Sequence, residues 1–108
     1  MKLTLPGLYA SPPPTRPIRL RYQKLSDPLN YDQSYPAIVV KSLHSKYALL
    51  VTKVKFIVAE SGSPLSHLAI VSREHGVTVF ITDLDLADLP DKGLLSADTE
   101  HVELGDGQ

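Results

Sequence analysis

The stretch Glu60–Phe80, ESGSPLSHLAIVSREHGVTVF, decides how this chain folds and where its chemistry lies. It follows the apolar run Phe56–Ala59, passes through small residues, and continues in a pattern typical of a helix. Ser66 is a favourable N-cap, because its hydroxyl can accept a hydrogen bond from an unpaired amide one turn ahead. Gly76 stands where a helix that has just ended favours glycine. The sequence therefore predicts a helix over residues 66–75.

The expected helix is apolar around most of its circumference. At about 100° per residue, one side carries Leu68, Val71, Ser72 and His75. Arg73 and Glu74 are the clearly polar positions. A helix with so wide an apolar surface packs heavily against a sheet, and its rigid N-terminus is a good place to hold a reactive side chain.

His67 stands in the first turn of this helix. A helix N-terminus presents unpaired amide donors and positive partial charge, and both favour an attached phosphate. The same field opposes protonation of the imidazole, which favours a nucleophilic ring nitrogen. The small residues Ser61, Gly62 and Ser63 would let a bulky phosphate approach the backbone. The pattern is typical of a phosphoryl acceptor, although an isolated histidine is more often structural or simply exposed.

Other chemistries fit these residues less well. His67 and His75 lie two helical turns apart, too far to share an ion on a straight helix, so no metal site is expected. Ser63 and Ser66 lack the glycine pattern of a nucleophile elbow. A hydrolase that uses Ser66 and His67 is disfavoured, because adjacent residues rarely orient as nucleophile and base. We interpret the remaining histidines as non-catalytic: His44 and His101.

Composition narrows the class of protein further. The 108 residues are 43% hydrophobic, enough for one core, and hold 11 basic and 12 acidic side chains. This balance gives no electrostatic reason to expect a nucleic acid or an anionic membrane as partner. The absence of cysteine excludes disulfides, thiol catalysis and thiolate metal sites. Apolar runs of four or five residues are far shorter than a membrane span, and no secretory signal is visible, so a cytoplasmic location is expected.

Alternation and short apolar runs predict strands on both sides of the helix. From Ile18 to Gln23 apolar and polar residues alternate, which is typical of a half-buried strand with a basic outer face. Apolar runs predict further strands at residues 37–40, 56–59, 78–81, 94–97 and 102–104. Tyr47–Leu50 is ambiguous, since it is either a helical turn capped by Ser45 or the opening of a strand.

The remaining segments are expected to be loops. Ser11–Pro17 holds four prolines and predicts an extended lead-in, while Ser26–Asn30 and Pro90–Gly93 are typical of turns. The tail, residues 105–108, is expected to fray. No internal repeat or low-complexity linker interrupts the chain. We therefore expect one compact α/β domain over residues 1–108, with its core at about 5–104.

The central stretch also resembles a known signature. In the mobile domain of the PEP-utilising enzymes the pattern is roughly G-G-x-[TLM]-[ST]-H-x-A-[IV]-x-[AS]-R-E-x-G-[IV]-P. The family includes pyruvate phosphate dikinase, phosphoenolpyruvate synthase, enzyme I of the sugar phosphotransferase system and rifampin phosphotransferase. Matches at fixed spacing are Ser66, His67, Ala69, Ile70, Arg73, Glu74 and Gly76. Weaker similarity covers most of the chain: Gly7 with residues 10–12 resembles the family's opening turn, and Gly93 with Asp98 its closing hairpin.

The chain departs from the family pattern at three places. Ser63 replaces the second glycine of the loop and adds a side chain where phosphate approaches. Thr78 replaces the proline after the helix, and Pro13 and Arg16 stand where the N-terminal segment often has glycines.

The resemblance implies a fold and a set of roles. The fold is the swivelling β/β/α phosphohistidine domain, and His67 is its phosphorylated histidine. Gly62, Ser63, Ser66 and Leu68 would position the phosphate, with Arg73 in support. The domain itself would bind no cofactor. ATP or PEP with Mg would bind to nucleotide-binding (ATP-grasp-like) or PEP-binding partner domains, between which the phosphoryl group is shuttled.

Two functions remain open at this point. The first is a phosphoryl carrier that turns over no substrate alone and is either free-standing or part of a longer enzyme. The second is a binding or regulatory module that keeps the fold without phosphotransfer, for which Ser63 is the motivation.

Overall fold

Four parallel strands form the centre of a curled, eight-stranded sheet in this computed structural model, which describes residues 2–106. In sheet order they are β3 (Ile18–Lys24), β4 (Ala37–Val40), β5 (Phe56–Ala59) and β6 (Thr78–Thr82). All residues of β4 and β5 are buried, because both faces of these strands are covered. Continuous apolar runs are what a strand buried on both faces requires.

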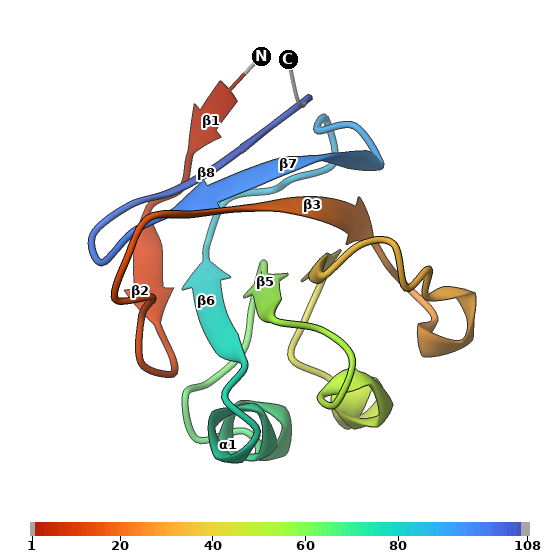
Figure 1. Cartoon of the computed structure of the whole chain (residues 1–108). Helices are drawn as coiled ribbons and strands as arrows, with labels where there is room; N and C mark the ends of the chain where they lie inside the picture. The colour runs from red at the N-terminus through yellow and green to blue at the C-terminus, as the bar shows by residue number, and fades with distance from the viewer. Residues whose placement is uncertain (1, 107–108) are drawn as a thin grey trace.

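Antiparallel strands extend the sheet at both of its sides. Beyond β3 lie β7 (Lys92–Ala97), β8 (Val102–Gly105) and β1 (Lys2–Thr4), and beyond β6 lies β2 (Gly7–Tyr9). The sheet curls so that β7 and β8 lie over β3, and the two ends of the chain lie together at the outermost pair (Figure 1). The two halves of the curled sheet enclose one hydrophobic core between them, which includes Tyr22, Phe56 and Leu104.

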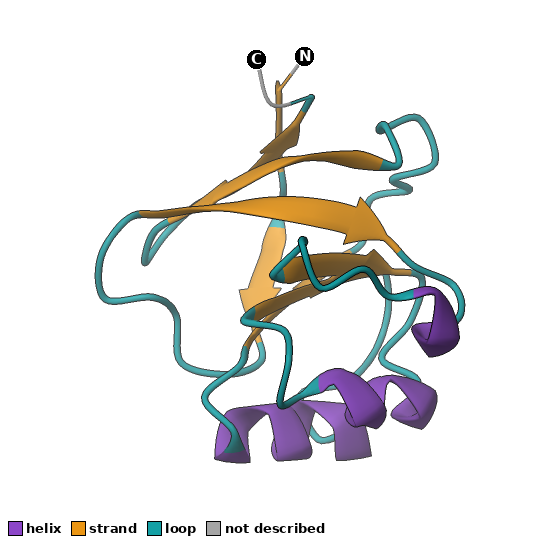
Figure 2. Ribbon diagram, turned by 45° about the vertical axis from the view of Figure 1, so that its right-hand side comes forward, coloured by secondary structure: helices purple, strands orange, loops and turns teal. Residues whose placement is uncertain are grey.

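Two helical segments cover the opposite face of the parallel strands: the 3-10 segment η2 (Ser45–Leu50) and the α-helix α1 (His67–Glu74). A further 3-10 segment, η1 (Pro28–Asn30), contacts η2 and buries none of its residues. Figures 1 and 2 show α1 and η2 side by side on this face, away from β7 and β8. Between them and the sheet lies a second core, to which α1 contributes Leu68 and Ala69. The described residues thus form a single compact domain of mixed α/β structure.

The strand predictions are largely confirmed. The strands at 37–40 and 56–59 have the predicted bounds, and those predicted at 18–23, 78–81 and 102–104 extend by one residue. Segment 47–50 adopts the helical alternative, but its N-cap is His44 rather than Ser45: the ring Nδ1 of His44 accepts a hydrogen bond from the Lys46 N–H at 3.0 Å.

Two details of the loop predictions are wrong, and two strands were not predicted. Lys92 and Gly93 belong to β7 and not to a turn, because they pair with β3. Gly105 does not fray, since it is buried in β8; residues 107 and 108 of the expected tail lie outside the described residues. The edge strands β1 and β2 were not foreseen, because three-residue strands have too few residues for a visible alternation. No helix of residues 2–106 has the length and apolarity to span a membrane.

Candidate functional site

His67 is the first residue of α1, as the capping pattern predicts. Ser66 has an extended backbone (φ −67°, ψ 157°), and its Oγ accepts a hydrogen bond from the Ala69 N–H at 3.2 Å. Its carbonyl oxygen accepts from the Ile70 N–H at 3.0 Å, which closes the first helical turn. At the other end Gly76 has a φ of +73°, the left-handed conformation expected after a helix. The local sequence therefore sets both ends of the helix.

Two backbone N–H groups in the first turn have no hydrogen-bond partner among the described residues. Within residues 2–106 nothing accepts a hydrogen bond from the N–H of His67 or of Leu68. The His67 side chain is exposed, and no described residue hydrogen-bonds its ring. Leu68, in contrast, is buried as a whole residue, backbone included, in the core beneath α1. An accessible imidazole thus stands beside unpaired N–H groups and the positive end of a helix.

The loop before the helix depends on Gly62. Its φ of +146° is one that side chains rarely adopt, and a Cβ there would lie 2.8 Å from the Cγ of Leu43. Ser61 joins the same two segments, because its Oγ donates to the Lys41 carbonyl at 3.1 Å and its own carbonyl accepts from the Leu43 N–H at 3.1 Å. Gly62 is therefore needed for close packing of the loop against the segment after β4.

Ser63, which departs from the family signature, fits this loop without backbone strain. No residue of the described range other than glycine has a positive φ. The Ser63 Oγ accepts a hydrogen bond from the Leu65 N–H at 3.0 Å, and its carbonyl accepts from the Ser66 N–H at 3.0 Å. The Ser63 hydroxyl thus takes up the Leu65 N–H, which would lack this partner if position 63 were glycine.

Arg73 lies at the other end of α1 from His67 but reaches back to the loop. Its Nη2 donates to the Pro64 carbonyl at 3.1 Å and to the Ala10 carbonyl at 2.9 Å. These contacts are structural pairing with backbone carbonyls and not a direct charge interaction with the His67 ring. The sequence did not indicate Ala10 as a partner, because it lies 63 positions away.

The other histidines have local partners. His44 caps η2, and His101 belongs to a turn in which the Asp98 Oδ1 accepts from the N–H groups of Glu100 and His101 at 2.8 and 2.7 Å. These backbone donors lower the pKa of Asp98. The Nδ1 of His75 lies 3.0 Å from the Val71 carbonyl oxygen. No three His, Asp or Glu side chains of residues 2–106 are grouped so as to hold a metal ion.

A cleft of about 430 Å³ opens where β3, β4 and β5 end. Lys24, Lys41 and Glu60 contribute to its wall, so it reaches the first residue of the loop, but His67 does not line it. The exposed His67 imidazole therefore lies outside this cleft. Such a position suits a group that must enter another active site better than one that encloses a substrate.

A family model matches the central part of the chain. A family model described as "PEP-utilising enzyme, mobile domain" matches residues 36–91, just over half of the 108-residue chain. The matched range begins just before β4, contains the whole loop and α1, and ends just before β7. No curated protein matches the sequence closely enough to count as a relative.

Proposed function

Because this chain belongs to the PEP-utilising enzyme mobile domain family, we propose that it carries a phosphoryl group on His67. The observation that supports this most directly is the exposed imidazole at the first position of α1, beside the unpaired N–H groups of His67 and Leu68. A phosphate attached to this ring would lie in the positive field of the helix N-terminus. Ser66 holds the helix start in place through its bond to Ala69.

The transfer takes place in two displacements. An unprotonated ring nitrogen of His67 attacks the phosphorus of a donor, an N–P bond forms, and the donor's P–O bond breaks with its electron pair leaving on oxygen. An acceptor oxygen then attacks the phosphorus, and the N–P bond breaks to restore the imidazole. Phosphoryl transfer depends mainly on positioning and charge stabilisation, which the partner sites supply together with Mg. ATP and PEP bind to those partners and not to this domain.

The family name places such a domain in larger enzymes, and hence beside partner domains. We propose that these are an ATP-grasp-like nucleotide-binding domain, a PEP-binding domain, or both. The domain would move between them as a rigid unit in the manner of the swivelling β/β/α fold. Two features support this: the described residues share one continuous sheet, and His67 projects from its outside rather than into a cleft. Alone, the domain would turn over no substrate.

Chemical phosphorylation tests the carrier role without a cognate donor. Phosphoramidate transfers its phosphoryl group to a neutral imidazole nitrogen with loss of ammonia. We expect an acid-labile, alkali-stable phosphate on His67 that forms faster than on His44, His75 or His101, and we expect none at position 67 in His67→Gln. Site-resolved mass spectrometry makes the measurement. Equal labelling of all four histidines in the wild-type chain would refute a special reactivity of His67.

A second function, a binding or regulatory module without phosphotransfer, is favoured by one contact. The Ser63 hydroxyl occupies the Leu65 N–H, which removes a donor from the loop that would receive phosphate. On this reading His67→Gln leaves binding to a cognate partner domain intact while no phosphohistidine can be trapped with ATP, PEP and that partner. Trapped phosphohistidine on His67 decides against it.

A further inference from the structure

The Arg73 guanidinium joins three segments that are distant in the chain. Through a single nitrogen, Nη2, it donates to the Pro64 carbonyl in the loop before α1 and to the Ala10 carbonyl after β2. Pro64 precedes the N-cap Ser66 by two residues, whereas Arg73 lies in the last turn of the helix. The side chain therefore links the last turn of α1 to the loop that leads to His67.

The Ala10 end of this clamp is itself held firmly. The Ala10 N–H donates to the Val79 carbonyl at 2.8 Å. The neighbouring Ser11 is 5% exposed; its Oγ donates to the Val77 carbonyl at 3.0 Å and accepts from the Val79 N–H at 2.7 Å. The Ala10 carbonyl thus has a fixed position relative to β6. Because Arg73 donates to both carbonyls, it holds the Pro64 carbonyl at a set position relative to β6 as well.

The clamp acts on the backbone that would meet a phosphate. Proline fixes φ at position 64, so the direction of its carbonyl sets the orientation of the following peptide unit. That unit leads into Leu65 and Ser66 and then to the unpaired amides of His67 and Leu68. A guanidinium presents its donors in a rigid fork, whereas a lysine ammonium is a point charge on a flexible stem. The planar guanidinium therefore fixes the directions of both N–H groups more tightly than a lysine at position 73 would.

We propose that Arg73 is a positioning residue for phosphorylation of His67, and that Ala10 and Ser11 are part of the same site. This inference rests on the proposed carrier function and deepens it. Residues 10 and 11 lie outside the range 36–91 that the family model matches, so the match does not assign them a role. The charge of Arg73 is directed to two carbonyls, and its effect on His67 passes through the loop.

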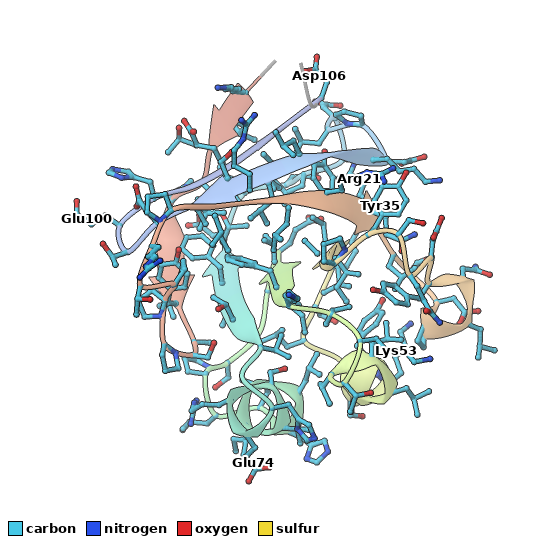
Figure 3. All side chains as sticks on the ribbon, in the orientation of Figure 1. Arg21, Tyr35, Lys53, Glu74, Glu100 and Asp106 are labelled. Atoms are coloured by element: carbon cyan, nitrogen blue, oxygen red, sulfur yellow. The ribbon has the colours of Figure 1, made fainter. Side chains whose placement is uncertain are left out.

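Chemical phosphorylation with phosphoramidate tests the clamp on the whole chain. The variants are Arg73→Lys, which keeps the charge but not the fork, and Ser11→Ala, which keeps Arg73 but loosens its anchor. Glu74→Gln is the matched control, because Glu74 is the exposed neighbour on the same helix and points away from the sheet in Figure 3. The readout is the labelling rate of His67 relative to His101 in the same molecule, since His101 lies in the β7–β8 turn.

We expect Arg73→Lys and Ser11→Ala to lower this ratio several-fold and Glu74→Gln to leave it unchanged. Amide hydrogen exchange should accelerate at Leu65 and Ser66 in the first two variants, while the exchange of β4 and β5 shows that the cores remain folded. An unchanged ratio in Arg73→Lys and Ser11→Ala, with His67 still labelled preferentially in the wild type, overturns the positioning role alone. A wild-type chain without preferential labelling of His67 overturns the proposed function, and the positioning role with it.

Discussion

Gly62 and Leu43 pack so closely that a single methyl group on the glycine would overlap the leucine side chain. A Cβ at position 62 would lie 2.8 to 2.9 Å from three carbon atoms of Leu43, and the glycine φ of +146° is itself unfavourable for other residues. This contact holds the start of the proposed phosphohistidine loop against the segment after β4. It also gives a physical reason for a glycine at position 62.

Replacement of this glycine should therefore be costly. We expect Gly62→Ala to lower the free energy of unfolding by about 1–3 kcal/mol, since backbone strain and overpacking act together. Gly76→Ala is the matched control, because Gly76 also has a positive φ (+73°) but nothing lies within 4 Å of its Cβ position. Urea denaturation of both variants separates the two effects. Equal losses at the two positions would mean that the Leu43 contact contributes nothing.

Two buried serines should respond in opposite ways to loss of the hydroxyl. Ser11 Oγ makes two hydrogen bonds, one to Val79 in β6 and one to Val77 just before it. Ser72 Oγ, in contrast, is buried and has no partner within residues 2–106. We expect Ser11→Ala to cost about 1–3 kcal/mol, because the Val77 carbonyl and Val79 N–H lose this partner. Ser72→Ala should leave the free energy of unfolding unchanged or raise it by up to about 1 kcal/mol. A loss in Ser72→Ala as large as in Ser11→Ala would contradict this view of the two hydroxyls.

The Ser63 hydroxyl should slow phosphorylation by occupying the Leu65 amide. We expect Ser63→Gly and Ser63→Ala both to raise the rate at which phosphoramidate labels His67, since both free that N–H. The difference in labelling rate between the two variants gives the effect of the Cβ at position 63, because Ser63→Gly removes that atom and Ser63→Ala keeps it. Site-resolved mass spectrometry gives the rates. If both variants label at the wild-type rate, the bond between Ser63 and Leu65 has no bearing on phosphate binding.

Tyr9 makes the stability of the domain sensitive to alkali. Burial and, to a smaller extent, the charge of Asp98 raise its pKa from 10.0 to about 12, and its hydroxyl donates to the Asp98 carbonyl at 2.6 Å. The stabilisation from keeping this phenol protonated is complete below about pH 10. It is lost as the pH rises through about 12, because the unfolded chain ionises first.

The matched variant is Tyr9→Phe, which keeps the ring contacts with Phe56 and Phe80. Its urea midpoint should fall less steeply than that of the wild type between pH 10 and about 12. Some alkaline loss should remain, since burial also raises the pKa of Tyr22 and Tyr47. Identical pH profiles for the two proteins would exclude Tyr9 as a source of the effect.

The sequence alone determines the helix and the placement of His67. Ser66, the apolar positions of α1 and Gly76 act within one or two turns of one another, so their effect depends on neighbours that the sequence already shows. The central strands are predictable for the same reason, because a run such as Phe56–Ala59 is apolar on both faces.

The tertiary structure decides what holds the loop that precedes that histidine. The Leu43 side chain against Gly62 and the carbonyls of Ala10 and Pro64 on Arg73 come from segments that meet only when the sheet forms. The sequence does not show which backbone carbonyl will accept a hydrogen bond from a given side chain, because every residue has a carbonyl. Strand order and register decide which carbonyls come within reach. The proposed acceptor residue can thus be predicted from the local sequence pattern, whereas the clamp that holds its loop arises only from contacts between distant segments.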